Sequence, residues 1–284
     1  MNKDSPVVVY TPGAELRSSG TMAKEMWRDL KASRELAWRL MVRDISAQYR
    51  QSLFGIFWAF LPPIVTALIF IFLNSRNIVN IGATDIPYPV FAIFGTVLWQ
   101  IFVYSLNAPL KVVSNAKPLL GKINFPKESL ILSSIGQTLF DAGTKIVILI
   151  AVFFIFNIPL TWGVLFSLPA ILVLILLGIT FGLLLTPIGV LYTDIPNSLM
   201  IITTLWFLIT PVVYPPPGGF PFSLLATVNP VSPILLGVRD LATKGILLNP
   251  GAFFVVTFLM LLVLIITWIV FRLSMTILVE RISV

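Results

Sequence analysis

The chain has 284 residues, of which 57% are hydrophobic and only 11% are charged. Soluble domains of average composition carry about 25% charged residues, so this deficit excludes an ordinary soluble protein. The apolar runs are long and continuous rather than alternating, which predicts membrane helices and not a barrel. Neither cysteine nor histidine occurs, which removes the thiolate nucleophile and the commonest metal ligand and general base. Basic cytoplasmic segments explain the net charge of +7, without nucleic acid as a partner.

The first fifty residues are polar and then amphipathic. Residues 1–20 contain two prolines and two glycines, so we expect a loosely attached polar tail. Residues 21–50 are predicted to form a cytoplasmic amphipathic interface helix. One face of this helix carries mostly apolar side chains, those of Met26, Leu30, Ala37 and Met41. Such a helix lies at the membrane surface or packs on another protein surface, and both can hold at once.

The chain changes character near residue 50. No charged residue occurs between Leu53 and Arg76, so we expect an elbow between a helix lying on the membrane and a helix that crosses it. Residues 51–284 are predicted to form one transmembrane domain. Its six apolar spans lie at 53–73, 89–109, 129–156, 164–191, 196–213 and 251–271, and each is long enough, or nearly so, to cross a bilayer.

Lys and Arg are distributed unevenly along this arrangement. Most of the 19 fall in the first 50 residues, between the second and third spans, or after the last span. Cytoplasmic segments are enriched in these residues, so both termini are predicted to be cytoplasmic. The predicted fold class is therefore all-α, a polytopic membrane protein with an N-terminal interfacial helix.

Two connections are too long to be simple turns. The inner one, 110–128, contains four lysines and the run Phe125-Pro126-Lys127-Glu128, which makes it a candidate docking element. The outer one, 214–250, is too apolar for a solvated loop and too rich in proline and glycine for a full span. We expect it to re-enter the outer face of the membrane as short helices, between the fifth and sixth spans.

The sequence contains no catalytic constellation and no Gly-x-x-x-x-Gly-Lys-Ser/Thr phosphate loop. We therefore expect no cofactor and no enzyme activity in this chain, so that any ATP hydrolysis belongs to another chain. Asp141 and Lys145 lie one helical turn apart in the third span. A charge inside a membrane is a functional candidate by default. The alternative is a mutually neutralised pair that holds helices together.

One face of the fifth span mixes hydroxyl and aromatic side chains, those of Thr203, Phe207, Thr210 and Tyr214, with Trp206 alongside. Aromatic rings stack on sugars and hydroxyls exchange hydrogen bonds with them, so this face suits a sliding glycan. Phe54, Phe57 and Trp58 offer similar rings nearer the cytoplasm. For each aromatic residue, apolar packing or interfacial anchoring is the alternative.

Arg43 and Arg50 lie on the polar side of the elbow. The planar guanidinium fork suits phosphate oxygens, so both are candidates for binding a substrate phosphate at the cytoplasmic mouth. Plain anchoring to lipid headgroups is the alternative.

The elbow resembles the start of an ABC-2 type permease of the polysaccharide-export branch, whose members export O-antigen, capsule or teichoic acid chains. The similar residues are Arg43-Asp44, Tyr49 to Leu53, and Gly55 to Trp58. Further similar runs follow in the family's order, namely Phe125 to Glu128, Asp194, Thr210 to Pro215, and Asn229-Pro230 through Pro233 to Arg239. Thr193 departs from the pattern, because many members have an arginine there.

The resemblance implies a homodimer of six-span subunits around a channel in the bacterial cytoplasmic (inner) membrane, in contact with membrane lipid. Two copies of a separate ATPase subunit would dock on the N-terminal helix and the inner loop. The docking residues implied in that loop are Lys117, Lys122, Phe125, Pro126, Lys127 and Glu128. The cargo would be a glycan joined by diphosphate to a polyprenyl lipid. The alternative is an ion-coupled secondary transporter or channel that works without an ATPase.

Overall fold

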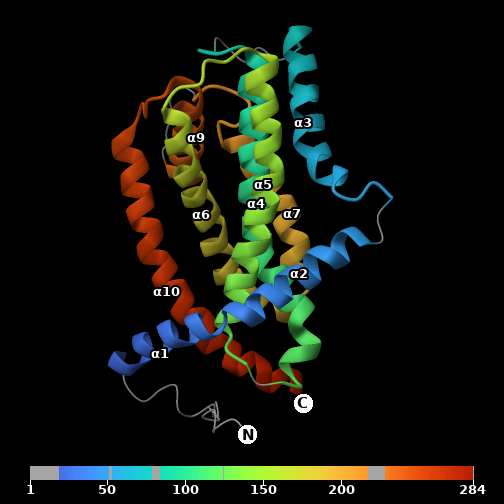
Figure 1. Cartoon of the computed structure of the whole chain (residues 1–284), viewed down its shortest axis with the longest axis vertical. Coiled ribbons are helices and arrows are strands. Elements are labelled where there is room, and N and C mark those ends of the chain that lie inside the picture. Colours follow the sequence, from blue (N-terminus) through green and yellow to red (C-terminus); the bar gives the residue numbers. More distant parts are fainter. Residues whose placement is uncertain (1–18, 51–52, 79–83, 124, 217–227, 284) are drawn as a thin grey trace, which may run out of the picture.

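The computed structural model describes residues 19–50, 53–78, 84–123, 125–216 and 228–283. Within these ranges every regular element is a helix, in agreement with the all-α prediction. The helices are α1 (Ser19–Ala32), α2 (Arg34–Arg50), α3 (Phe57–Ser75), α4 (Tyr88–Leu120), α5 (Glu128–Ile155), α6 (Gly163–Leu191), α7 (Asp194–Ile209), α9 (Val231–Lys244) and α10 (Pro250–Ser283). Figure 1 shows an upright bundle with α1 and α2 lying across one end, where α10 also ends.

Five described helices, α3, α4, α5, α6 and α10, are long and apolar enough to cross a membrane. This confirms a multi-pass helical membrane protein. The predicted fifth span corresponds to α7, which has only 16 residues. At about 1.5 Å per residue it extends about 24 Å, short of the roughly 30 Å hydrocarbon layer. The sixth crossing therefore stays a prediction.

Two helices continue beyond the predicted spans. Most of the predicted inner loop, 110–128, is helical, because α4 continues to Leu120 and leaves only a short connection to α5. Likewise α10 continues to Ser283 instead of ending near residue 271. Hydropathy marks where a chain leaves lipid, and a helix can extend into water past that point. In the predicted re-entrant connection, α9 is helical, whereas 217–227 lie outside the described residues.

The core is centred on α4. Its largest fully buried side chains include Phe94, Leu98 and Phe102, and α4 packs most extensively against α6 and α5. Gly178 and Gly182 of α6 permit this close approach, because a Cβ at either position would collide with α4. Small residues four apart are a common device for close crossing of membrane helices.

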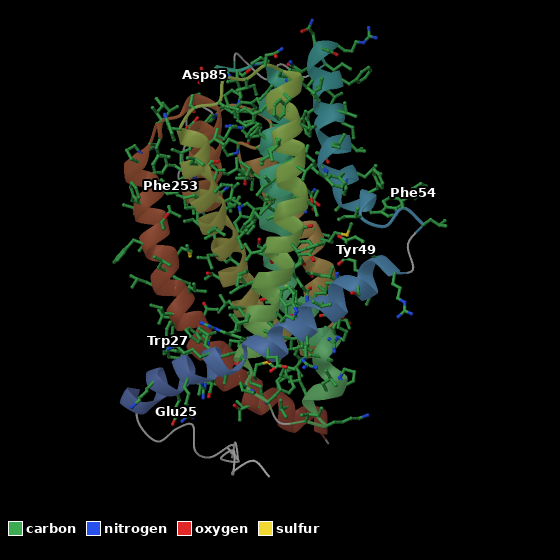
Figure 2. The ribbon with its side chains drawn as sticks, in the orientation of Figure 1. Glu25, Trp27, Tyr49, Phe54, Asp85 and Phe253 are labelled. Carbon is green, nitrogen blue, oxygen red and sulfur yellow. The ribbon has the colours of Figure 1, made fainter. Side chains whose placement is uncertain are left out.

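The predicted interface helix is two helices, α1 and α2, separated at Ser33. The Ser33 hydroxyl donates to the carbonyl oxygen of Asp29, at 2.6 Å. Ala37 and Leu40 of α2 are buried where α2 packs against α5. Trp27 and Trp38 are exposed on the opposite side, and Figure 2 shows Trp27 at this end of the bundle. One face of the pair therefore packs on the chain's own bundle, and the membrane-surface role of the exposed face stays a prediction.

Candidate functional site

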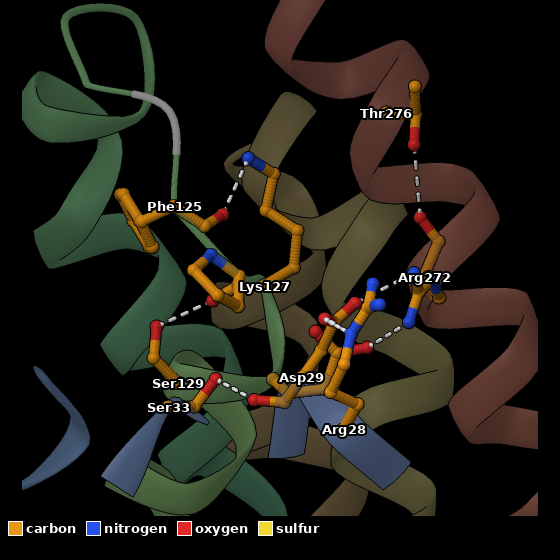
Figure 3. Close-up of polar contacts among 10 residues, drawn as sticks. Arg28, Asp29, Ser33, Phe125, Lys127, Ser129, Arg272 and Thr276 are labelled. Atoms are coloured by element: carbon orange, nitrogen blue, oxygen red, sulfur yellow. Dashed lines mark hydrogen bonds and ion pairs between the residues drawn. The ribbon is translucent and has the colours of Figure 1, made fainter. Parts of the chain in front are cut away.

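A buried charge cluster joins three separate parts of the chain at the α1–α2 end (Figure 3). Arg272 of α10 donates to Asp29 of α1 at 2.9 Å and to Glu128, the first residue of α5, at 2.8 Å. All three residues are at most 5% exposed. Buried charges need partners to offset the loss of hydration, and here one guanidinium serves two carboxylates. The cluster therefore fixes α1 and the start of α5 to α10.

The short inner connection folds back on itself beside this cluster. The Lys127 ammonium donates to the carbonyl oxygen of Phe125 at 3.1 Å and lies 5.2 Å from the centre of its ring. The Phe125 side chain is buried, and the Ser129 hydroxyl donates to the Pro126 carbonyl oxygen at 2.8 Å. The buried Phe125 ring and the Pro126 carbonyl thus shape the connection from within, and Figure 3 shows Lys127 beside Phe125.

The predicted docking residues divide into three groups by exposure. Lys122 is exposed, Lys117, Pro126 and Lys127 are half-buried, and Phe125 and Glu128 are buried. A buried Glu128 that pairs with Arg272 stabilises the protomer and does not present its charge to a partner. Sequence reasoning missed Ile123, which is 56% exposed at the turn and is an apolar side chain that a partner could cover.

Asp29 and Arg272 were also missed. The buried positions of α1 and α2 are Met26, Asp29, Ser33, Ala37, Leu40 and Asp44, which recur at three- and four-residue intervals and so share one face. Two features of the sequence could have indicated these residues. Asp29 is an acid on that otherwise mostly apolar face, and Arg272 is a lone arginine at the end of the last apolar run. Nothing in the local pattern joins positions so far apart in the chain.

At the elbow, the two candidate phosphate-binding arginines differ. Arg43 donates to Asp44 at 2.9 Å, and the other carboxylate oxygen of Asp44 accepts from Gln137 of α5 at 3.0 Å. The charge of Arg43 is therefore already engaged. Arg50, at the end of α2, is exposed and keeps its guanidinium available to a phosphate or a headgroup.

The three elbow aromatics remain together and accessible. Phe54, Phe57 and Trp58 are each more than half exposed, and the rings of Phe54 and Trp58 meet edge to face at 6.1 Å. Figure 2 shows Phe54 pointing away from the bundle. With Leu61 they line a shallow apolar pocket, consistent with either a lipid or a substrate contact.

The predicted hydroxyl and aromatic face of α7 turns inward. Thr203 and Thr210 are buried, and their hydroxyls donate to the carbonyl oxygens of Leu199 and Trp206 in their own helix. Phe207 packs against Phe70 of α3 and Trp99 of α4. Within one protomer this face is therefore not open to a passing chain. The opposite face, with Ile201, Leu205 and Leu208, is exposed. The sequence prediction could not distinguish the two faces, because helical periodicity shows which residues share a face and not whether that face is covered.

The end of α7 is held by one side chain. Asn229 accepts a hydrogen bond from the Trp206 indole at 3.0 Å and donates to the Thr210 hydroxyl at 2.8 Å. Its oxygen also accepts from the backbone N–H of Val231, which opens α9. Tyr214 donates to the Leu208 carbonyl oxygen at 2.8 Å. Asn229 thus joins α7 to α9.

Asp141 and Lys145 form an ion pair within α5, and both side chains are buried. The ammonium also lies 5.3 Å from the centre of the Tyr104 ring of α4. The carboxylate that an ion-coupled carrier would titrate is therefore already neutralised by its neighbour. The structure favours the interpretation of a mutually neutralised pair.

The end of the bundle opposite α1 and α2 carries a pocket of about 390 Å³ between α9, α10 and the segment before α4. Lys244 of α9 donates to Asp85 at 2.6 Å, and this hydrogen bond lowers the pKa of the Asp85 carboxyl. Arg239 lies 3.6 Å from the centre of the Phe91 ring and donates to the Val212 carbonyl oxygen. These contacts fix α9 onto α4.

Five membrane-length helices and an inner connection fixed by buried charges define a multi-pass helical membrane protein. Residues 35–243 match the ABC-2 type transporter family, and the chain belongs to that family. It is 27% identical, over 192 residues, to the O-antigen export system permease protein RfbA of Myxococcus xanthus, covering 66% of this chain and 71% of that one. The same-named protein of Klebsiella pneumoniae is 26% identical over 211 residues, covering 72% and 79%.

Proposed function

We propose that this chain is the transmembrane subunit of an ABC transporter that exports an O-antigen-type polysaccharide across the bacterial inner membrane. The observation that carries the proposal is the ABC-2 match over residues 35–243, which spans the elbow and the helices from α3 to α9. The O-antigen export permeases with similar sequences support the choice of cargo. ATP hydrolysis is assigned to a separate partner subunit.

The partner is proposed to dock on the inner connection and on the exposed side of α1 and α2. Two features support this surface. The connection presents Lys122 and Ile123 outward, while Glu128 at its end is bound to Arg272 and, through it, to α1 and α10. A displacement of the connection therefore reaches three helices at once. The Lys and Arg distribution supports a cytoplasmic location for both termini, on the same side as this surface.

The path is proposed to form between two copies of the chain. The elbow aromatics Phe54, Phe57 and Trp58 are exposed and supply stacking surfaces near its cytoplasmic mouth. Arg50, exposed at the end of α2, is proposed to bind the diphosphate of a polyprenyl-linked glycan. The exposed apolar side of α7, and not the inward-facing side, would meet lipid or the second copy.

The test uses cells that make a surface polysaccharide with this chain as the only exporter. Deleting its gene should remove the long glycan from the surface and cause lipid-linked glycan to accumulate inside. Supplying the wild-type chain should restore export. A surface glycan that is unchanged in the deletion strain would reject the proposed function.

The proposed role of Arg50 in binding the substrate diphosphate can be tested in the same cells. An Arg50→Gln variant should reduce export, and Arg50→Lys should restore it only in part, because lysine keeps the charge and loses the fork. Full export by both variants would remove Arg50 from substrate recognition and leave the main proposal intact.

A further inference from the structure

The exposed surface of α4 differs from that of the other membrane-length helices. α3, α5, α6 and α10 each expose several large apolar side chains, whereas α4 exposes none. Its four exposed residues are Lys111, Ser114, Asn115 and Pro118. The half-buried residues Gln100, Tyr104 and Asn107 continue this face toward the middle of the helix, at intervals of three and four residues. We name Gln100, Tyr104, Asn107 and Lys111 the α4 stripe.

The polar groups of the α4 stripe have few protein partners. No hydrogen bond joins the Gln100 amide or the Tyr104 hydroxyl to another described residue. Asn107 donates only to the Val103 carbonyl oxygen of its own helix, at 2.8 Å. Lys111 donates to the neutral amide of Gln48 in α2, at 2.9 Å. Hydrocarbon offers no partner to such groups, so this face of α4 is unsuited to lipid.

An open pocket of about 260 Å³ lies along the α4 stripe. One water molecule needs only roughly 15 Å³ of such space, so the pocket holds several. All four stripe residues line it, and Lys145 of α5 closes one side. Lys145 is paired with Asp141, whereas the ammonium of Lys111, nearer to α2, donates to the neutral amide of Gln48.

We propose that the α4 stripe is a water-exposed wall of the export path and that it binds the saccharide chain directly. The inference rests on the proposed export of a polysaccharide. The path is then lined by α4 as well as by the elbow aromatics. Water and saccharide hydroxyls supply the hydrogen-bond partners that lipid cannot offer to the polar groups of the stripe.

The chemistry of the α4 stripe matches a neutral, hydroxyl-rich chain. The Gln100 and Asn107 amides each carry both donors and acceptors, as sugar hydroxyls require. Tyr104 adds a ring surface and a hydroxyl between them. Each contact can exchange with water at little cost, so successive sugars can bind and leave. A single tight site would instead hold the chain in place.

The test measures water access and saccharide protection at single cysteines. The native chain has no cysteine, so Gln100→Cys, Tyr104→Cys and Asn107→Cys each give one reporter in the full-length protein with its ATPase partner. Val147→Cys and Ile150→Cys are the controls, since both are at least half exposed on the apolar side of α5. Each variant is treated in inverted membrane vesicles with a charged maleimide and, separately, with a lipid-soluble maleimide.

The α4 cysteines should react with the charged reagent at least about tenfold faster than the controls, because thiolate formation needs water and one pKa unit is a factor of ten. Vesicles from cells that make the lipid-linked glycan should label these positions more slowly than vesicles from cells blocked in its first glycosyl step. The control positions should not respond to the glycan.

Each other result overturns the inference in a defined way. Reaction with the lipid-soluble reagent alone places the stripe against lipid. Failure with both reagents, together with disulfide formation between copies, places it in a dimer contact. Fast labelling without glycan protection removes the saccharide contact. None of these results depends on the gene-deletion assay, so the proposed export function is judged separately.

Discussion

Gly182 of α6 lies against the backbone carbonyl oxygen of Leu106 in α4, so closely that a Cβ at position 182 would collide with it. The obstacle is backbone and cannot rotate away. Gly182→Ala should therefore separate α4 from α6 and destabilise the protein by about 1–3 kcal/mol. The melting temperature in detergent measures this.

Gly143→Ala is the matched control, because no atom lies within 4 Å of the position its Cβ would take. Within α5 this substitution should be neutral or stabilise by up to about 1 kcal/mol, as alanine is the better helix former. Equal melting temperatures for the two variants would contradict the close crossing of α4 and α6.

Arg272→Gln should destabilise the protein by about 3–5 kcal/mol, because it removes the cation that two buried carboxylates share. Arg39→Gln is the control, since Arg39 pairs with Glu35 at 2.7 Å while both side chains are about three-quarters exposed. That change should cost less than about 1 kcal/mol.

Neutralising the two carboxylates, Asp29 and Glu128, should partly restore the stability that Arg272→Gln removes. Combining Arg272→Gln with Asp29→Asn and Glu128→Gln leaves no buried charge in the cluster and should recover part of the lost melting temperature. If Arg272→Gln alone melts like the wild type, the cluster does not hold α1 and α5 to α10.

Ile123→Asp should lower ATPase stimulation by the transport subunit without changing its melting temperature. Ile123 is exposed, so the new charge stays in water within the protomer and is desolvated only where a partner covers it. Phe125→Asp should lower both, since that ring is buried in the protomer. Ile246→Asp, equally exposed near the opposite end of the bundle, should change neither. Normal stimulation by Ile123→Asp would show that the partner docks elsewhere.

Asn229→Ala should destabilise the α7–α9 connection by about 2–4 kcal/mol, because it leaves the Trp206 indole and the Val231 N–H without their acceptor. Limited proteolysis and melting temperature report the change. Asn197→Ala, on the exposed start of α7, is the comparison and should remain close to the wild type. Loss of stability at both positions would point to a general effect of α7 and not to this network.

The sequence was most informative about which apolar segments form long helices. The predicted spans 129–156 and 164–191 agree within a residue with α5 and α6, because each is a long, mostly apolar run bounded by polar or turn-forming residues. It was least informative about where helices end in water. The lysines after residue 110 are compatible with helix as well as loop, so the continuation of α4 to Leu120 was not predicted.

The sequence predicted only part of the candidate site, because it shows which residues share a helix face but not what packs against that face. The period of Thr203, Phe207 and Thr210 predicts one shared face, but a period does not say whether that face is covered. Only the packing of Phe70 and Trp99 against Phe207 shows that it turns inward. The Arg272 cluster needs residues from both ends of the chain, and a single sequence carries no signal that joins them.

The hydrogen bond between Asp29 and Arg272 spans 243 positions of the chain. Ribosomes add about 5–20 residues per second, so roughly 10–50 seconds separate the synthesis of its two partners. During that interval α1 is made but has no Arg272 to receive its carboxylate. A chain interrupted before this arginine never closes the cluster. α1 is therefore joined to α10 only after synthesis has passed Arg272, while the rest of α10 is still being added.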